Sequence, residues 1–98
     1  MRSHTYAVYL LTNRPGGTPY CGVTNDLARR LTEHRAGQAC SFTRRYNLTR
    51  LVWVEPHTDI REAILREKRI KKWNRAWKVE LIEAENPNWC DLAEDVGI

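Results

Sequence analysis

The chain has no long hydrophobic run, since no apolar stretch approaches the roughly 18 consecutive residues of a membrane-spanning helix. The first residues also lack the basic start and apolar segment of a secretory signal peptide. There are only three cysteines, and Cys21, Cys40 and Cys90 form neither a C-x-x-C pair nor an even disulfide set. These absences argue against a membrane protein, a disulfide scaffold and a structural zinc site, and they predict a protein of the reducing cytoplasm.

Positive charge is missing from the end of the chain. Residues 1–78 hold all 16 lysines and arginines against six Asp and Glu, whereas residues 79–98 hold six acidic residues and no basic one. The net charge of +4 therefore conceals a strongly basic part, which favours a polyanion such as nucleic acid and an attraction that weakens with salt. From charge alone, basic helices that are simply solvated are an equally good interpretation.

The length of 98 residues allows one domain with a single modest core. A content of 42% hydrophobic and 29% charged residues is ordinary for a folded protein and argues against disorder. We expect one domain over residues 1–98, with its core in about 5–85 and an acidic C-terminal segment in about 86–98.

Three segments have strand composition. Residues 5–12 are rich in β-branched and aromatic side chains, and a turn-forming stretch at 13–18 separates them from a second extended run at 19–23. Together these segments predict an antiparallel hairpin. Residues 50–55 predict a third strand, which we expect Pro56 to end because proline cannot donate a backbone hydrogen bond.

Helix signals follow. Residues 24–26 have the chemistry of a helix start and Gly37 that of a stop, and residues 38–49 predict a loop that holds at most a short helical turn. Asp59 predicts the cap of a second helix. That helix runs to about Trp73, and a break at Asn74 separates it from a third helix over 76–85. The fold class is α+β, a small three-stranded antiparallel sheet flanked by helices.

The first helix holds a cation on its apolar side. Consecutive residues of a helix are about 100° apart around its axis. Four residues therefore fall within one stripe of the helix surface: Leu27, Arg30, Leu31 and His34. Glu33 lies opposite this stripe. Charged side chains are rarely buried without a partner, so the pattern raises the question of what Arg30 contacts.

The second helix holds an acid in the same way. Ala63, Ile64 and Ile70 predict its buried stripe, and Glu67 falls in the middle of that stripe. A carboxylate there needs a cation, a hydrogen-bond donor or a metal ion. The pattern alone favours an ordinary i,i+4 pair with Lys71.

These features occur in a recognisable order. Ala7-Val8-Tyr9 and Tyr20-Cys21-Gly22 are followed by Arg30, His34 and Glu67. Over about residues 5–89 the chain resembles the GIY-YIG nuclease superfamily, and in size and layout its small single-domain bacterial YhbQ-like group.

The resemblance implies an endonuclease that hydrolyses phosphodiester bonds in DNA with one divalent cation, Mg²⁺ or Mn²⁺, in DNA repair or processing. It makes Tyr9 the general base or water-positioning group and Tyr20 a hydrogen-bonding partner at the site, and it leads us to expect Arg30 poorly paired in a shallow basic groove of the free protein. It also makes Arg30 the phosphate clamp and Glu67 the metal ligand. His34 either accepts a proton, contacts phosphate or only packs beside Arg30. We expect DNA as the partner, a protein recruiter as a further one, and a monomer or weak dimer.

The chain departs from the family pattern at several positions. Ala7 and Val8 replace Gly and Ile in the first motif, and Cys21 occupies the middle of the second. The asparagine that many superfamily nucleases carry falls near Lys78, while Asn74 comes too early to substitute for it. Cleavage stays compatible with these departures, but support for the site is reduced.

Basic and aromatic residues outside these motifs are placed to track a nucleic-acid backbone, with Tyr46 available for stacking: Arg44, Arg45, Tyr46, Lys68, Lys71 and Lys72. Trp53, on the third strand, is predicted to be core, and the i,i+4 series Trp73, Trp77 and Leu81 favours core over base platforms.

His4 and His57 have no supporting neighbours and are expected to be structural or exposed.

Two other functions are compatible with the sequence. One alternative to the nuclease is a nucleic-acid-binding module of the same fold with little or no cleavage. The other is an interaction protein whose acidic C-terminal segment docks a basic partner.

Overall fold

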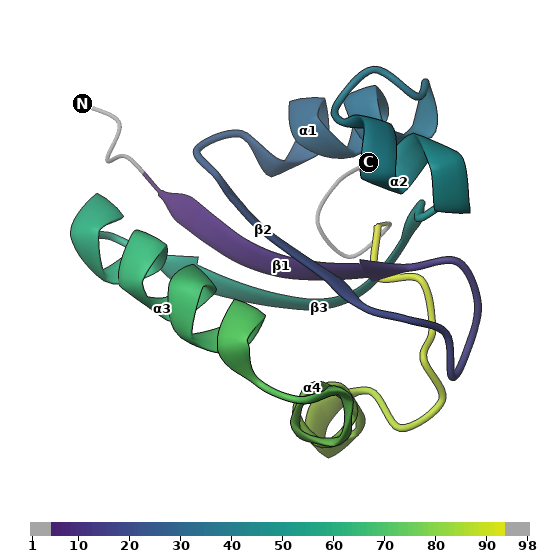
Figure 1. Cartoon of the computed structure of the whole chain (residues 1–98). Helices are drawn as coiled ribbons and strands as arrows, with labels where there is room; N and C mark the ends of the chain where they lie inside the picture. Colours follow the sequence, from purple (N-terminus) through teal and green to yellow (C-terminus); the bar gives the residue numbers. More distant parts are fainter. Residues whose placement is uncertain (1–4, 94–98) are drawn as a thin grey trace.

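The computed structural model describes residues 5–93. Its elements follow one another as β1 (Tyr6–Thr12), β2 (Tyr20–Thr24), α1 (Leu27–Arg35), α2 (Ser41–Tyr46), β3 (Arg50–His57), α3 (Ile60–Lys72) and α4 (Arg75–Glu85). The strands form one antiparallel sheet in the order β2-β1-β3. Figure 1 shows α1 and α2 on one side of this sheet and α3 and α4 on the other. The predicted α+β fold with a three-stranded antiparallel sheet is confirmed.

The central strand β1 is covered on both faces. Because side chains alternate along a strand, Val8 and Leu10 point to the core under α3 and α4. Tyr9 and Leu11 point to a second core, which they share with Leu31 of α1. Tyr9 is therefore buried on the same side of the sheet as α1.

Local capping chemistry sets the helix ends. Asp26 accepts a hydrogen bond from the backbone N–H of Arg29 at 3.1 Å, and Asp59 caps α3 in the same way. Asn74, where we predicted a break between two helices, is the N-cap of α4. The short turn predicted within residues 38–49 is the six-residue helix α2.

The predicted end of the third strand was wrong. Pro56 does not stop β3, which continues to His57 and pairs Pro56 with Ala7. The strand β3 lies at the edge of the sheet, where a backbone nitrogen that faces away from the neighbouring strand needs no N–H. The prediction for His57 was also incomplete, because its Nε2 lies 2.8 Å from Glu55 Oε1, two residues away on the same side of the strand. His4 lies outside the described residues.

Two apolar residues predicted as core are exposed. Ile64 lies on the outer side of α3, although Ala63 and Ile70 are fully buried as predicted. Trp77 is 56% exposed on α4, whereas Trp53 is buried, as predicted. A three-stranded sheet is narrow, so each helix buries only the stripe that faces it and leaves the flanking apolar positions in water.

The chain after α4 returns across the sheet. Trp89 is buried in the core under α3 and α4, and Ala93 lies in the core on the side of α1. Asp91 accepts a hydrogen bond from the backbone N–H of Leu51 at 3.3 Å and forms an ion pair with Arg35 at 3.1 Å. Within residues 5–93, no helix combines the length and the apolar character needed to cross a membrane.

Candidate active site

The site is built around Tyr9 and the glycine that faces it. Tyr9 of β1 pairs in register with Gly22 of β2, and a Cβ atom on Gly22 would collide with the ring and hydroxyl of Tyr9. Gly22 therefore gives the phenol room to lie across β2. The sequence predictions did not name Gly22 as a site residue, although a glycine inside a strand is a signal of such close approach.

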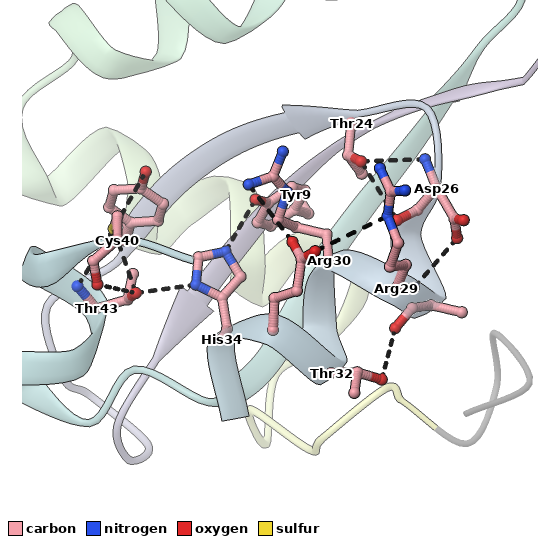
Figure 2. A network of polar contacts seen from close by, with 12 residues as sticks. Tyr9, Thr24, Asp26, Arg29, Arg30, Thr32, His34, Cys40 and Thr43 are labelled. Carbon is pink, nitrogen blue, oxygen red and sulfur yellow. Dashed lines mark hydrogen bonds and ion pairs between the residues drawn. The ribbon is translucent and has the colours of Figure 1, made fainter. Parts of the chain in front are cut away.

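A chain of hydrogen bonds links Tyr9 to α1 and α2, as Figure 2 shows. The Tyr9 hydroxyl lies 3.1 Å from His34 Nε2, and His34 Nδ1 lies 2.9 Å from the hydroxyl oxygen of Thr43. The Thr43 hydroxyl has one proton and can donate it to the backbone carbonyl of Cys40 at 3.2 Å, in which case its oxygen accepts a hydrogen bond from His34 Nδ1. This arrangement favours the tautomer with the proton on Nδ1. The lone pair of Nε2 then accepts the Tyr9 proton.

Burial sets the charge state of these groups. Burial, and secondly Arg30, lower the pKa of His34 below its ordinary value, which makes the imidazole neutral at neutral pH. Burial, and secondly the neighbouring Tyr20, raise the pKa of Tyr9, while burial and a hydrogen bond with Cys40 raise the pKa of Tyr20 to about 12. Both phenols are therefore protonated, and a neutral base lies in hydrogen-bonding contact with one of them.

Cys40 connects the two tyrosines through α2. Its thiol lies 3.8 Å from the Tyr20 hydroxyl and 3.2 Å from the hydroxyl of Thr43. Burial raises the pKa of the thiol, but hydrogen bonds with Thr43 outweigh it and bring the pKa below its ordinary value. Neither Cys40 nor Thr43 was predicted as a site residue. Their contribution depends on the fold of residues 38–49, which carry no periodic pattern.

Arg30 is less buried than its helical position predicted. Its side chain is 37% exposed, and Nη1 lies 3.8 Å from Oε1 of Glu33. Glu33 was predicted to lie opposite, but residues three apart are neighbours on a helix surface. An exposed pair at this distance stabilises little, so the guanidinium is available to an anionic ligand.

Glu67 lies on α3 next to the edge strand β2, where its backbone carbonyl oxygen is 4.0 Å from the sulfur of Cys21. Its side chain is 12% exposed, and Oε2 lies 2.6 Å from the Lys71 ammonium, so the structure contains the predicted i,i+4 pair. Lys71 Nζ in turn lies 6.0 Å from the ring centroid of Tyr20. Tyr20 is on the edge strand β2, and its ring centroid also lies 5.9 Å from that of His34.

The side chains around Glu67 fit Mg²⁺ or Mn²⁺ only if the protein supplies few of the ligands of the ion. Residues 5–93 contain no group of three or more His, Cys, Asp or Glu side chains able to hold a metal ion. Mg²⁺ commonly keeps several waters and takes one or two carboxylates with a substrate phosphate. Glu67 fits that pattern as the protein ligand once the Lys71 ammonium moves away.

The other predicted nucleic-acid contacts divide into two groups. Arg44, Arg45 and Tyr46 are exposed on α2, and Lys68 and Lys72 are exposed on α3. The two helices lie on opposite sides of the sheet, so the two groups are also on opposite sides of it (Figure 1).

A buried asparagine was also missed. Asn86 follows α4 and donates hydrogen bonds to the carbonyls of Val52 and Cys90 at 3.0 and 2.9 Å. Its Oδ1 accepts one from the N–H of Cys90 at 3.0 Å. The prediction placed the family asparagine near Lys78. Asn86 instead fastens the last described segment to β3, and the only sequence signal was its position before proline.

Comparisons with known proteins show the family of the chain. Residues 5–80 match the family model described as the GIY-YIG catalytic domain. A UPF0213 protein of Bacillus pumilus is 36% identical over 83 residues, which cover 85% of this chain and 84% of that protein. A UPF0213 protein of Halobacterium salinarum is 42% identical over 65 residues, 66% of this chain and 84% of that protein. The solution NMR structure of the UPF0213 protein BH0048 from Bacillus halodurans has a TM-score of 0.54 at 29% identity, covering 84% of this chain and 86% of that one.

Proposed function

The chain belongs to the GIY-YIG family, and from this premise we propose that it is a divalent-metal-dependent endonuclease that hydrolyses phosphodiester bonds in DNA. The observation that carries the proposal is the 3.1 Å contact between the Tyr9 hydroxyl and Nε2 of His34, which is unprotonated in the tautomer that Thr43 favours. A fold kept only for binding needs a positive surface, but it does not need a buried phenol held against a neutral base.

A tyrosine with its ordinary pKa of about 10 is protonated at neutral pH and is a weak base by itself. We therefore assign the task of the base to Tyr9 and His34 together. The raised pKa of Tyr9 prevents it from ionising alone at neutral pH. In the proposed step, Tyr9 takes a proton from the attacking water while it gives its own proton to His34 Nε2. The resulting hydroxide forms the new bond to phosphorus, and the leaving oxygen departs with the electron pair of the broken bond. His34 ends as an imidazolium, whose Nδ1–H remains bonded to Thr43.

In this scheme Arg30 binds the phosphate directly, and Glu67 holds the metal ion. The guanidinium of Arg30 presents a planar fork that matches two phosphate oxygens. Glu67 would hold Mg²⁺ or Mn²⁺, which when bound supplies stabilisation of the negative charge that develops on the phosphate and leaving oxygens. In this scheme the hydroxyl of Tyr20 orients the substrate by hydrogen bonding.

A second candidate is a nucleic-acid-binding module of the same fold with little or no cleavage. The observation that favours it is the Lys71 ammonium, which already neutralises the Glu67 carboxylate at 2.6 Å. In a binding module this pair would be permanent, and the basic residues of α2 and α3 would be the only ones that contact nucleic acid.

Cleavage assays distinguish the two candidates. Branched, flapped and linear DNA are incubated with the protein in Mg²⁺ or Mn²⁺, beside Arg30→Ala and Glu67→Gln. Arg29→Ala is the matched control, because Arg29 is the adjacent, more exposed arginine of the same helix. We expect metal-dependent cleavage that both site variants lose and the control keeps. Binding without cleavage under all these conditions would select the second candidate.

A further inference from the structure

A cleft lies beside the site, between the β1–β2 connection and α2. Its volume of about 440 Å³ is within the usual range of small-ligand sites. Buried Leu48 forms part of the lining, and Phe42 and Tyr46 form another part of it. The proposed hydrolysis gives this cleft no task.

The aromatic rings of the cleft form a row that starts in the site. Phe42 and Tyr46 are one helical turn apart, with ring centroids at 5.0 Å. Phe42 also stacks on Tyr20 at 5.9 Å with an interplanar angle of 27°. Both Phe42 and Tyr46 are nearly half exposed, at 46% and 48%. Apolar ring faces are therefore presented to solvent directly beside a residue of the site.

The charge around these rings is positive. Arg14 and Arg75 line the cleft, and Arg75 is held there by a hydrogen bond that it donates to the carbonyl of Gly16. The guanidinium carbon of Arg45 lies 5.5 Å from the ring centroid of Tyr46. None of the described residues that line the cleft is acidic. Ring faces bordered by arginines are complementary to a nucleotide, which has a flat base and an anionic phosphate.

We propose that this cleft binds one unpaired nucleotide of a DNA strand, next to the phosphate at Tyr20. Its base stacks against Phe42 and Tyr46, and Arg14 and Arg75 contact its phosphate. A base inside a duplex is stacked on both faces and paired, so it cannot enter without leaving the helix. The inference rests on the proposed function and deepens it by naming the substrate class, which is DNA with an unpaired strand at the cleavage point.

Binding in EDTA tests the cleft independently of cleavage. The probes are a fluorescent oligothymidine, the same strand with one abasic position moved along it, and a duplex of equal length. Phe42→Ala and Tyr46→Ala should each weaken binding of the intact strand about tenfold and leave duplex binding nearly unchanged. Phe42→Tyr keeps a ring and should bind normally. Trp77→Ala, which removes an exposed aromatic residue outside the cleft, is the matched control.

The abasic series provides the decisive comparison. One abasic position should weaken binding to the unchanged protein about as much as Phe42→Ala does, and should have little further effect on Phe42→Ala, because both changes remove the same stack. Arg14→Gln should lower the slope of log affinity against log salt by about one. Circular dichroism checks that each variant is folded.

The outcomes separate this inference from the nuclease proposal. If the abasic effect disappears in Phe42→Ala while the protein cuts no DNA, the cleft is supported and the nuclease is refuted. If the protein cuts DNA but Phe42→Ala binds the intact strand as tightly as Trp77→Ala does, and the abasic position weakens binding to both variants equally, the cleft proposal is overturned. Equal losses for single strand and duplex would also overturn it.

Discussion

Replacing Thr43 by valine tests whether the proton position on His34 determines activity. Valine has nearly the shape of threonine, so the change removes the hydroxyl and leaves the packing of α2 intact. The Nδ1–H of His34 then has no acceptor at 2.9 Å, whereas the carbonyl of Cys40 still accepts from the backbone N–H of Arg44. A buried polar group left unpaired costs about 1–3 kcal/mol, so we expect the free energy of unfolding to fall by that amount.

The same change should redistribute the histidine tautomers. With the proton on Nε2, His34 donates to the Tyr9 oxygen and no longer accepts its proton. General base catalysis commonly contributes about 10²- to 10⁴-fold, so a partial shift of tautomer should slow single-turnover cleavage about 10- to 100-fold. Binding of DNA in EDTA should not change, because Thr43 is buried.

Urea denaturation and single-turnover kinetics measure the two effects. Thr43→Ser restores a hydroxyl at the same position and should recover most of the rate. The reasoning is refuted if Thr43→Val cleaves at the normal rate. It is refuted equally if Thr43→Ser is as slow as Thr43→Val, since packing rather than the hydroxyl would then be responsible.

Three other predictions follow from the same contacts. Lys71→Met should free the Glu67 carboxylate and tighten Mn²⁺ binding by up to about fivefold in calorimetry without DNA, because an ion pair with one exposed partner contributes about 1 kcal/mol. Unchanged affinity would mean that Lys71 does not compete. Gly22→Ala should force the ring of Tyr9 away from β2 and reduce the free energy of unfolding by about 1–3 kcal/mol in urea titrations, and wild-type stability would contradict the close approach. The lowered pKa of His34 means that the unfolded chain binds more protons, so its contribution to stability is complete above about pH 6.5 and is lost as the pH falls toward the folded-state pKa. Cleavage should decline on the acid side over the same range, and a His34→Gln protein with the same acid limb in its pH–rate profile would exclude this assignment.

Much of the fold was predictable because its signals are local. Asp59 and Asn74 cap helices through hydrogen bonds to N–H groups only two or three residues away, so their roles can be inferred from neighbouring sequence. Strand composition likewise located all three strands. The predicted end of β3 was wrong because a strand tolerates Pro56 only where it lies at the edge of the sheet. No local sequence pattern shows which strand lies at the edge.

The candidate site was likewise predictable only in part. The order of Tyr9, Tyr20, Arg30 and Glu67 along the chain, and the pair of Glu67 with Lys71, were accessible from sequence because motifs and i,i+4 spacing are local. The exposure of Trp77 was not, since a helical pattern gives a direction but not the width of the surface that covers it.

The sequence by itself therefore determined the elements, their order and the residue types that could serve a phosphodiesterase. Only the tertiary structure decided how those residues meet. Tyr9 and His34 are 25 positions apart, and their hydrogen bond exists because Gly22 leaves space for the phenol and Thr43 turns the imidazole. Such contacts depend on the relative placement of β1, β2, α1 and α2, which is set by packing of the whole core rather than by any segment alone.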